Sequence, residues 1–145
     1  MATRPPAPGL SIGLAAALAT LARTAGILNP WDESDDEFHA FAVPLEKQTR
    51  LTPESFRAAL AIGARYEVVL GPAGDSLAEL AAAGADWGQG VADGWGLIAK
   101  IMHATLTDVS IAWARGKGVL RVRVWLFGRD ATGALVGLRS MSTET

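Results

Sequence analysis

Apolar residues recur at a spacing of three or four in two long stretches of the chain, and this spacing predicts amphipathic helices. The first helix is expected over residues 11–25, and its apolar stripe consists of Leu10, Leu14, Leu18 and Leu21. The second is expected over residues 90–106, and its apolar stripe consists of Val91, Trp95, Ile98, Met102 and Leu106. Each stripe is wide enough to cover part of a hydrophobic core.

Two shorter helices are predicted from the residues that favour a helix start. Thr52 suits the N-cap, Pro53 the first helical position and Glu54 the first turn. Further along, Ser76 and Glu79 have the spacing of a capping box, in which each side chain binds the backbone of the other. We therefore expect one short helix after Thr52 and another after Ser76.

Alternation of apolar and polar positions predicts β-strands, most of them in the last third of the chain. The expected strands span residues 38–43, 66–70, 109–114, 120–127 and 134–142. Within the second strand, Val68, Val69 and Leu70 are expected to be buried. This order of elements predicts an α+β fold with a mainly antiparallel sheet and helices on one or both of its faces.

Composition limits the classes of protein to which the chain can belong. Its 145 residues, 50% hydrophobic and 19% charged, fit one globular domain, which we place at residues 10–145 after a flexible proline-rich arm at residues 1–9. The absence of cysteine excludes disulfides, cysteine-based zinc sites and a thiol nucleophile. The net charge of -2 argues against direct binding of nucleic acid.

No apolar run reaches the roughly 18 residues that a membrane span requires, and we expect a cytoplasmic protein. An alternative stays open, because Arg4 and the apolar stretch that follows it have the outline of a signal peptide. If residues 1–19 are such a peptide, the protein is secreted.

The strongest local charge lies at residues 32–37, where five of six positions are carboxylates. Two interpretations are open: a solvated turn that keeps the protein soluble, or an anionic surface held between two buried elements. The stretch lacks the central glycine and the alternating ligands of an EF-hand, so we expect no metal site and no cofactor. Trp31 and Trp87 lie in expected loops, either as lids on the core or as anchors for a protein partner.

No motif for nucleophilic catalysis is present, since the chain has neither Gly-x-Ser-x-Gly nor a P-loop. One enzymatic alternative remains, a small hydrolase in which His39 acts with carboxylates such as Asp35 and Glu37. The other histidine, His103, is expected on the face of a helix. We expect a protein that is not an enzyme.

Two separate segments resemble the nuclease A inhibitor family, whose members inhibit sugar-non-specific nucleases. Residues 24–28, followed by Glu33-Ser34-Asp35 and Phe38, are similar to that family's "T-x-G-L-L" and "S-E-S-D-Y-P-F". Residues 133–140 and the final Glu144-Thr145 resemble its closing "G-x-x-A-G-L-S-T" and "E-T".

Two shorter matches, Asp86-Trp87 and residues 106–109, lie between these segments in the family's order. The family's Tyr-Pro is replaced here by Asp36-Glu37 and its first Ser by Asp32, so the loop of this chain is more acidic. The resemblance covers most of the chain after the proline-rich arm.

The resemblance implies a three-layer α-β-α sandwich that blocks the active site of a metal-dependent, sugar-non-specific nuclease. Glu33 would pair with arginines of the nuclease, and the terminal Thr145 would reach its catalytic Mg²⁺. Asp35, Asp86, Trp87 and Glu144 would make further contacts with this protein partner. The alternative is a binding module of the same fold whose partner is not a nuclease, and the oligomeric state is left open by the sequence.

Overall fold

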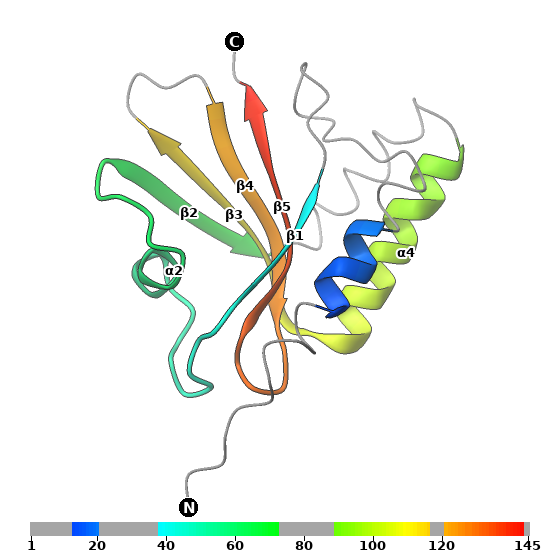
Figure 1. The fold of residues 1–145 in the computed structure, drawn as a ribbon, viewed down its shortest axis with the longest axis horizontal. Helices are drawn as coiled ribbons and strands as arrows, with labels where there is room; N and C mark the ends of the chain where they lie inside the picture. Colours follow the sequence, from blue (N-terminus) through cyan, green and yellow to red (C-terminus); the bar gives the residue numbers. More distant parts are fainter. Residues whose placement is uncertain (1–12, 21–37, 73–88, 117–120, 144–145) are drawn as a thin grey trace, which may run out of the picture.

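The structure is a computed structural model, and it describes residues 13–20, 38–72, 89–116 and 121–143. Five strands form one sheet with the order β1-β5-β4-β3-β2 (Figure 1). The strands are β1 (His39–Val43), β2 (Tyr66–Pro72), β3 (Thr107–Gly116), β4 (Arg121–Arg129) and β5 (Leu135–Thr143). The helices are α2 (Pro53–Ala59), α4 (Gln89–Thr105) and the helical residues 13–20.

Every pair of neighbouring strands in this sheet is antiparallel. The last three strands follow one another directly, β1 lies outside β5, and β2 lies outside β3. The α+β fold with a mainly antiparallel sheet is therefore confirmed. The two outer strands come from the first half of the chain, and β5 lies inside the sheet.

Strand β4 is the centre of the fold because both of its faces are buried. Val124 and Leu126 point to one face, and both are inaccessible to solvent. Trp125 and Phe127 point to the other face and are 1% and 0% exposed. Such double burial is typical of a central strand between two layers of side chains.

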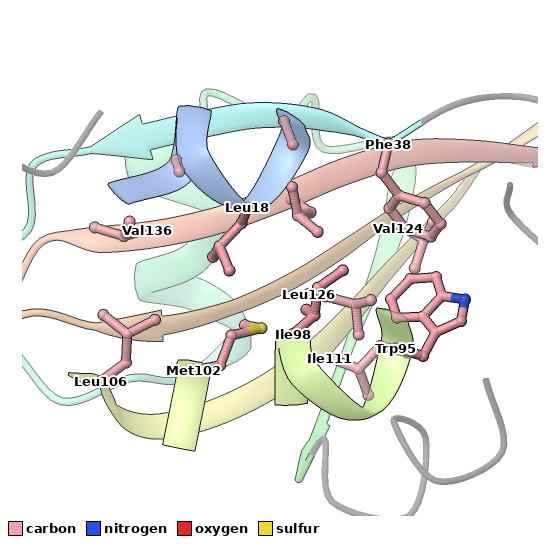
Figure 2. Packing of buried hydrophobic residues seen from close by; sticks show 13 residues of the cluster. Leu18, Phe38, Trp95, Ile98, Met102, Leu106, Ile111, Val124, Leu126 and Val136 are labelled. Atoms are coloured by element: carbon pink, nitrogen blue, oxygen red, sulfur yellow. The ribbon is translucent and has the colours of Figure 1, made fainter. Parts of the chain in front are cut away.

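One core lies between the sheet and the helical residues 13–20 together with α4 (Figure 2). The predicted stripe is confirmed at Trp95, Ile98 and Met102, which are fully buried, and at Leu106, which is 6% exposed. Ala15, Leu18 and Ala19 belong to the same core. No helix in the described part of the chain is long and apolar enough to cross a membrane.

The second core lies on the opposite face, where α2 covers β4. Thr52 caps α2 as expected, and its hydroxyl accepts a hydrogen bond of 3.1 Å from the Ser55 amide. Ser55 completes the capping box by accepting from the Thr52 amide at 2.8 Å. The cap directs Phe56 onto the sheet, where its ring centroid lies 5.2 Å from Trp125 and 5.1 Å from Phe127.

The expectation that Val68, Val69 and Leu70 are all buried is wrong for Val69, which is 50% exposed. Val68 and Leu70 belong to the core beneath α2, but alternation turns Val69 to the opposite face. Since β2 is an outer strand, Val69 lies beyond the part of this face of the sheet that the α4 core covers. A continuous apolar run is thus misleading at the edge of a sheet.

Arg129 joins two distant turns from a buried position, with 7% of its surface exposed. Its guanidinium donates to the Thr49 carbonyl at 2.6 Å and to the Glu46 carbonyl at 2.8 Å. Its Nε donates to Gly133 O at 3.0 Å. Charge-assisted bonds to backbone acceptors of this kind satisfy a buried cation and fix the turn after β1 against the β4–β5 turn.

Gly137 of β5 lies in unusually close contact with β4. A Cβ at this position would lie 2.7 Å from Phe127 Cα and would overlap the Leu126 carbonyl group. Both obstacles are backbone atoms of the central strand, so they cannot move aside as a flexible side chain does. Only glycine allows β5 to pack here.

We expect Gly137→Ala to lower the free energy of unfolding by about 1–3 kcal/mol, because the added methyl group forces β5 away from β4. Urea denaturation followed by circular dichroism measures the change. Gly71→Ala is the matched control, since a Cβ on that strand glycine meets nothing within 4 Å. Equal stability of the two variants would contradict the close approach.

Candidate partner-binding end of the sheet

The six residues predicted to bind a partner lie outside the described residues: Glu33, Asp35, Asp86, Trp87, Glu144 and Thr145. The rest of the acidic stretch 32–37 lies outside them as well. The structure does describe the residues to which these segments are directly joined. These points of attachment define the candidate site.

The acidic stretch and the C-terminus are attached to neighbouring strands. His39, the first residue of β1, pairs with Arg139 of β5. Because the two strands are antiparallel, β5 continues for four residues past the start of β1 and ends at Thr143. Glu37 precedes His39 by two residues, and Glu144 follows Thr143 directly.

Helix α4 begins at the same end of the molecule. Phe38 is buried against Trp95 in an edge-to-face contact with 5.1 Å between ring centroids (Figure 2). At the other end of the helix, a Cβ on Gly128 would lie 2.6 Å from Leu106 Cβ. Gly128 pairs with Val136, near the start of β5, so α4 runs away from the end of β5 (Figure 1).

We call this region the β1–β5 end and define it by Phe38, Thr143 and the first turns of α4. All three segments that carry predicted site residues are joined to it, because Asp86-Trp87 precedes the start of α4 at Gln89. Segments far apart in the sequence are thus joined to the described fold at the same end of the molecule.

Cationic side chains lie near this end, on the face of the sheet that α2 covers over β4. The sequence analysis did not identify them. Arg139 is exposed, and no hydrogen bond or ion pair joins its side chain to another described residue. The Arg123 Cζ lies 4.9 Å from the centroid of the Trp125 ring, a cation–π contact that holds the guanidinium in place. His39, also exposed, lies on the same row as Arg139.

This arrangement suits the recognition of a carboxylate or phosphate, because a guanidinium offers paired donors to such groups. The sequence does contain a signal, since Arg123 alternates with Val124 along β4. Alternation alone did not reveal the pair of arginines, because only the β4–β5 register brings Arg139 near Arg123. This register places Arg139 opposite Trp125.

An open groove lies elsewhere, between β2, β3 and the turn before α2, with a volume of about 490 Å³. Its lining includes Arg50 and Asp108, and Asp108 adopts a positive φ of 50° at a β-bulge. The Ser110 hydroxyl donates to the Asp108 carbonyl at 2.6 Å. The groove thus combines one cation and one anion, and its lining contains no histidine that would activate Ser110 as a nucleophile.

The hydrolase alternative finds no partner for its histidine among the described residues. His39 and His103 are both exposed, and neither forms a hydrogen bond or ion pair within that part of the chain. Asp35 and Glu37 lie outside it. The described residues also contain no group of three or more histidine, cysteine or carboxylate side chains that could hold a metal ion.

We expect a double-mutant cycle of Phe38→Leu and Trp95→Leu to give a coupling free energy of about 0.5–1.5 kcal/mol, because each ring packs against the other. Urea unfolding of the two single variants and the double variant measures it. Phe38→Leu with Phe56→Leu is the control cycle, since Phe56 lies in the other core. Additivity in both cycles would show that Phe38 is not clamped to α4.

Comparison with known proteins adds no family assignment: the chain matches no protein-family model, and no curated protein matches it.

Proposed function

We propose that this chain is a protein inhibitor that blocks the active-site cleft of a metal-dependent, sugar-non-specific nuclease and has no catalytic activity of its own. The observation that carries the proposal is the common attachment of three segments at the β1–β5 end. A plug requires its contact residues on one side of the molecule. The antiparallel pairing of β1 with β5 favours such a placement for the acidic stretch and the C-terminus.

The chemistry of the acidic stretch suits a nuclease cleft. Such a cleft binds phosphate with cationic groups, and carboxylates can occupy the same positions through charge-assisted hydrogen bonds. Glu33 is the proposed partner of the nuclease arginines, with Asp35 beside it. Five carboxylates in six positions also accelerate association with a cationic partner and make the rate sensitive to salt.

The C-terminus offers the second group of contacts. Mg²⁺ prefers oxygen ligands, and the Thr145 carboxylate beside its own hydroxyl and Glu144 supplies several of them. Strand β5 pairs with β1 as far as Arg139 and with β4 as far as Thr143, so the residues leading to this terminus are anchored to the central strand of the sheet. Asp86 and Trp87, just before α4, are the proposed flanking contacts.

The proposal includes the three-layer α-β-α sandwich and a cytoplasmic location. For the sandwich, support comes from the two cores on opposite faces of the sheet. One of the helical layers would be thin, because α2 has only seven residues.

A second candidate is a binding module of the same fold with a partner that is not a nuclease. It is favoured by Arg139 and Arg123, which lie near the β1–β5 end and match an acidic partner surface better than a cationic cleft. The two candidates therefore differ in the charge that they require of the partner.

We expect saturating protein to stop plasmid degradation by at least one magnesium-dependent, non-specific nuclease in a panel. Glu33→Ala and deletion of Thr145 should each raise the inhibition constant about tenfold or more, since each removes one partner of a buried charged contact. Glu54→Ala on α2 is the matched control and should inhibit normally. Unimpaired cleavage across the panel would exclude the inhibitor function.

Reversal of charge with Arg139→Glu separates the two candidates. Association with a cationic nuclease cleft should become faster, and surface plasmon resonance at low and high salt measures the rate. A module for an acidic partner should instead lose affinity for the protein that it recovers from its host. Recovery of a nuclease by the unaltered chain would exclude the second candidate.

A further inference from the structure

Strand β2 is an outer strand, and no strand in the described part of the chain pairs with its second side. Each of its seven residues, from Tyr66 to Pro72, pairs with a residue of β3 without a bulge. Its middle residue, Val69, is the most exposed of the large hydrophobic side chains in the described part of the chain. An outer strand of this kind is a template for pairing with another strand.

The hydrogen bonds of Tyr66 reveal which backbone groups of β2 face outward. The Tyr66 amide donates to the Gly63 carbonyl at 3.1 Å, and the Tyr66 carbonyl accepts from Arg57 Nη2 at 2.6 Å. Neither partner belongs to β3, so both groups of Tyr66 point away from it. Because this direction alternates along an antiparallel strand, the backbone groups of Val68, Leu70 and Pro72 point outward as well.

The outward edge is closed at both ends. Tyr66 is occupied by Gly63 and Arg57, and Pro72 has no N–H to donate. Between them, Val68 and Leu70 each present one N–H and one C=O, for which the described residues supply no hydrogen-bond partner. The free edge is therefore a window of two donors and two acceptors.

We infer that β2 pairs antiparallel with β2 of a second copy of this chain, with the two-fold axis at Val69. In this register Val68 lies opposite Leu70 of the other copy, and each such pair exchanges two hydrogen bonds. The two pairs together use all the donors and acceptors of both windows. Val69 lies opposite its own counterpart, which buries both exposed side chains against each other.

Neighbouring registers fit the edge less well. A two-fold axis at Glu67 would place two carboxylates opposite each other and would require the occupied groups of Tyr66. An axis at Gly71 would pair Leu70 with Pro72, which lacks a donor. With the axis at Val69, Glu67 lies opposite Gly71, so no like charges meet.

Because the chain has no cysteine, a single introduced thiol tests this register directly. We expect Val69→Cys to form a disulfide-linked dimer under mild oxidation, since opposed residues at a non-hydrogen-bonded position have Cα atoms about 4.5 Å apart. Glu67→Cys should not, because its two copies would lie about 13 Å apart along the strands. Leu97→Cys, also exposed but on α4, is the second control.

A non-reducing gel measures the linked fraction over time. Rapid linkage of Val69→Cys alone supports the pairing. Equal linkage of all three variants would indicate random collision, and faster linkage of Glu67→Cys would indicate another register. Either result would overturn the inference.

Analytical ultracentrifugation tests the pairing without a cross-link. We expect the unaltered chain to show a monomer–dimer equilibrium that depends on concentration, and Val69→Lys to weaken it about tenfold or more by opposing two cations. Leu97→Lys introduces the same charge at a residue of similar exposure, 46% for Leu97 against 50% for Val69. It should leave the equilibrium unchanged. Val69→Thr, which keeps the branched shape without charge, should retain dimerisation.

Circular dichroism confirms that each variant is folded. A monomer at all concentrations, or equal effects of the two lysine variants, would overturn the inference. Because these measurements require no nuclease, their failure and a failure of the inhibitor function are distinguishable.

Discussion

The fold depends on the burial of β4 from both sides. Phe56 of α2 covers Trp125 and Phe127 on one face, and the α4 side chains cover Val124 and Leu126 on the other. Each large hydrophobic side chain contributes about 1.5–3 kcal/mol when it is fully buried. The Trp125 Nε1 atom is buried and has no hydrogen-bond partner among the described residues, and an unsatisfied buried donor costs about 1–3 kcal/mol. Apolar packing at this position thus outweighs an unsatisfied donor.

The position of the candidate site follows from this central strand. Because β4 is fixed on both faces, its neighbour β5 is fixed too, and the close contact at Gly137 leaves no room for the pair to slide. The register of β5 then fixes the start of β1 through the pairing of His39 with Arg139. The sheet, rather than a loop, determines where the acidic stretch and the C-terminus leave the fold.

Local patterns in the sequence predicted the elements but not their neighbours. The α4 stripe, the Thr52 cap and the strand alternation depend on residues close in the chain, and the structure confirms them. Strand order depends on contacts between distant segments, so the sequence did not show that β2 is an outer strand and that Val69 is exposed. The same reason explains why Arg129, which binds carbonyls about 80 residues away, gave no signal.

The same distinction between local patterns and contacts of distant segments applies to the candidate site. Its acidic residues were found from local charge and from the resemblance, and they remain predictions, whereas Arg139 and Arg123 required the β4–β5 register.

The two outer strands of the sheet have different surroundings, and this separates the two proposed interactions. Strand β1 leads from the acidic stretch into the β1–β5 end, whereas β2 lies across the full width of the sheet from it. Pairing of two β2 strands would extend the sheet without covering either β1–β5 end. Because the paired strands run in opposite directions, the two ends would point away from each other, and each copy would bind its partner independently.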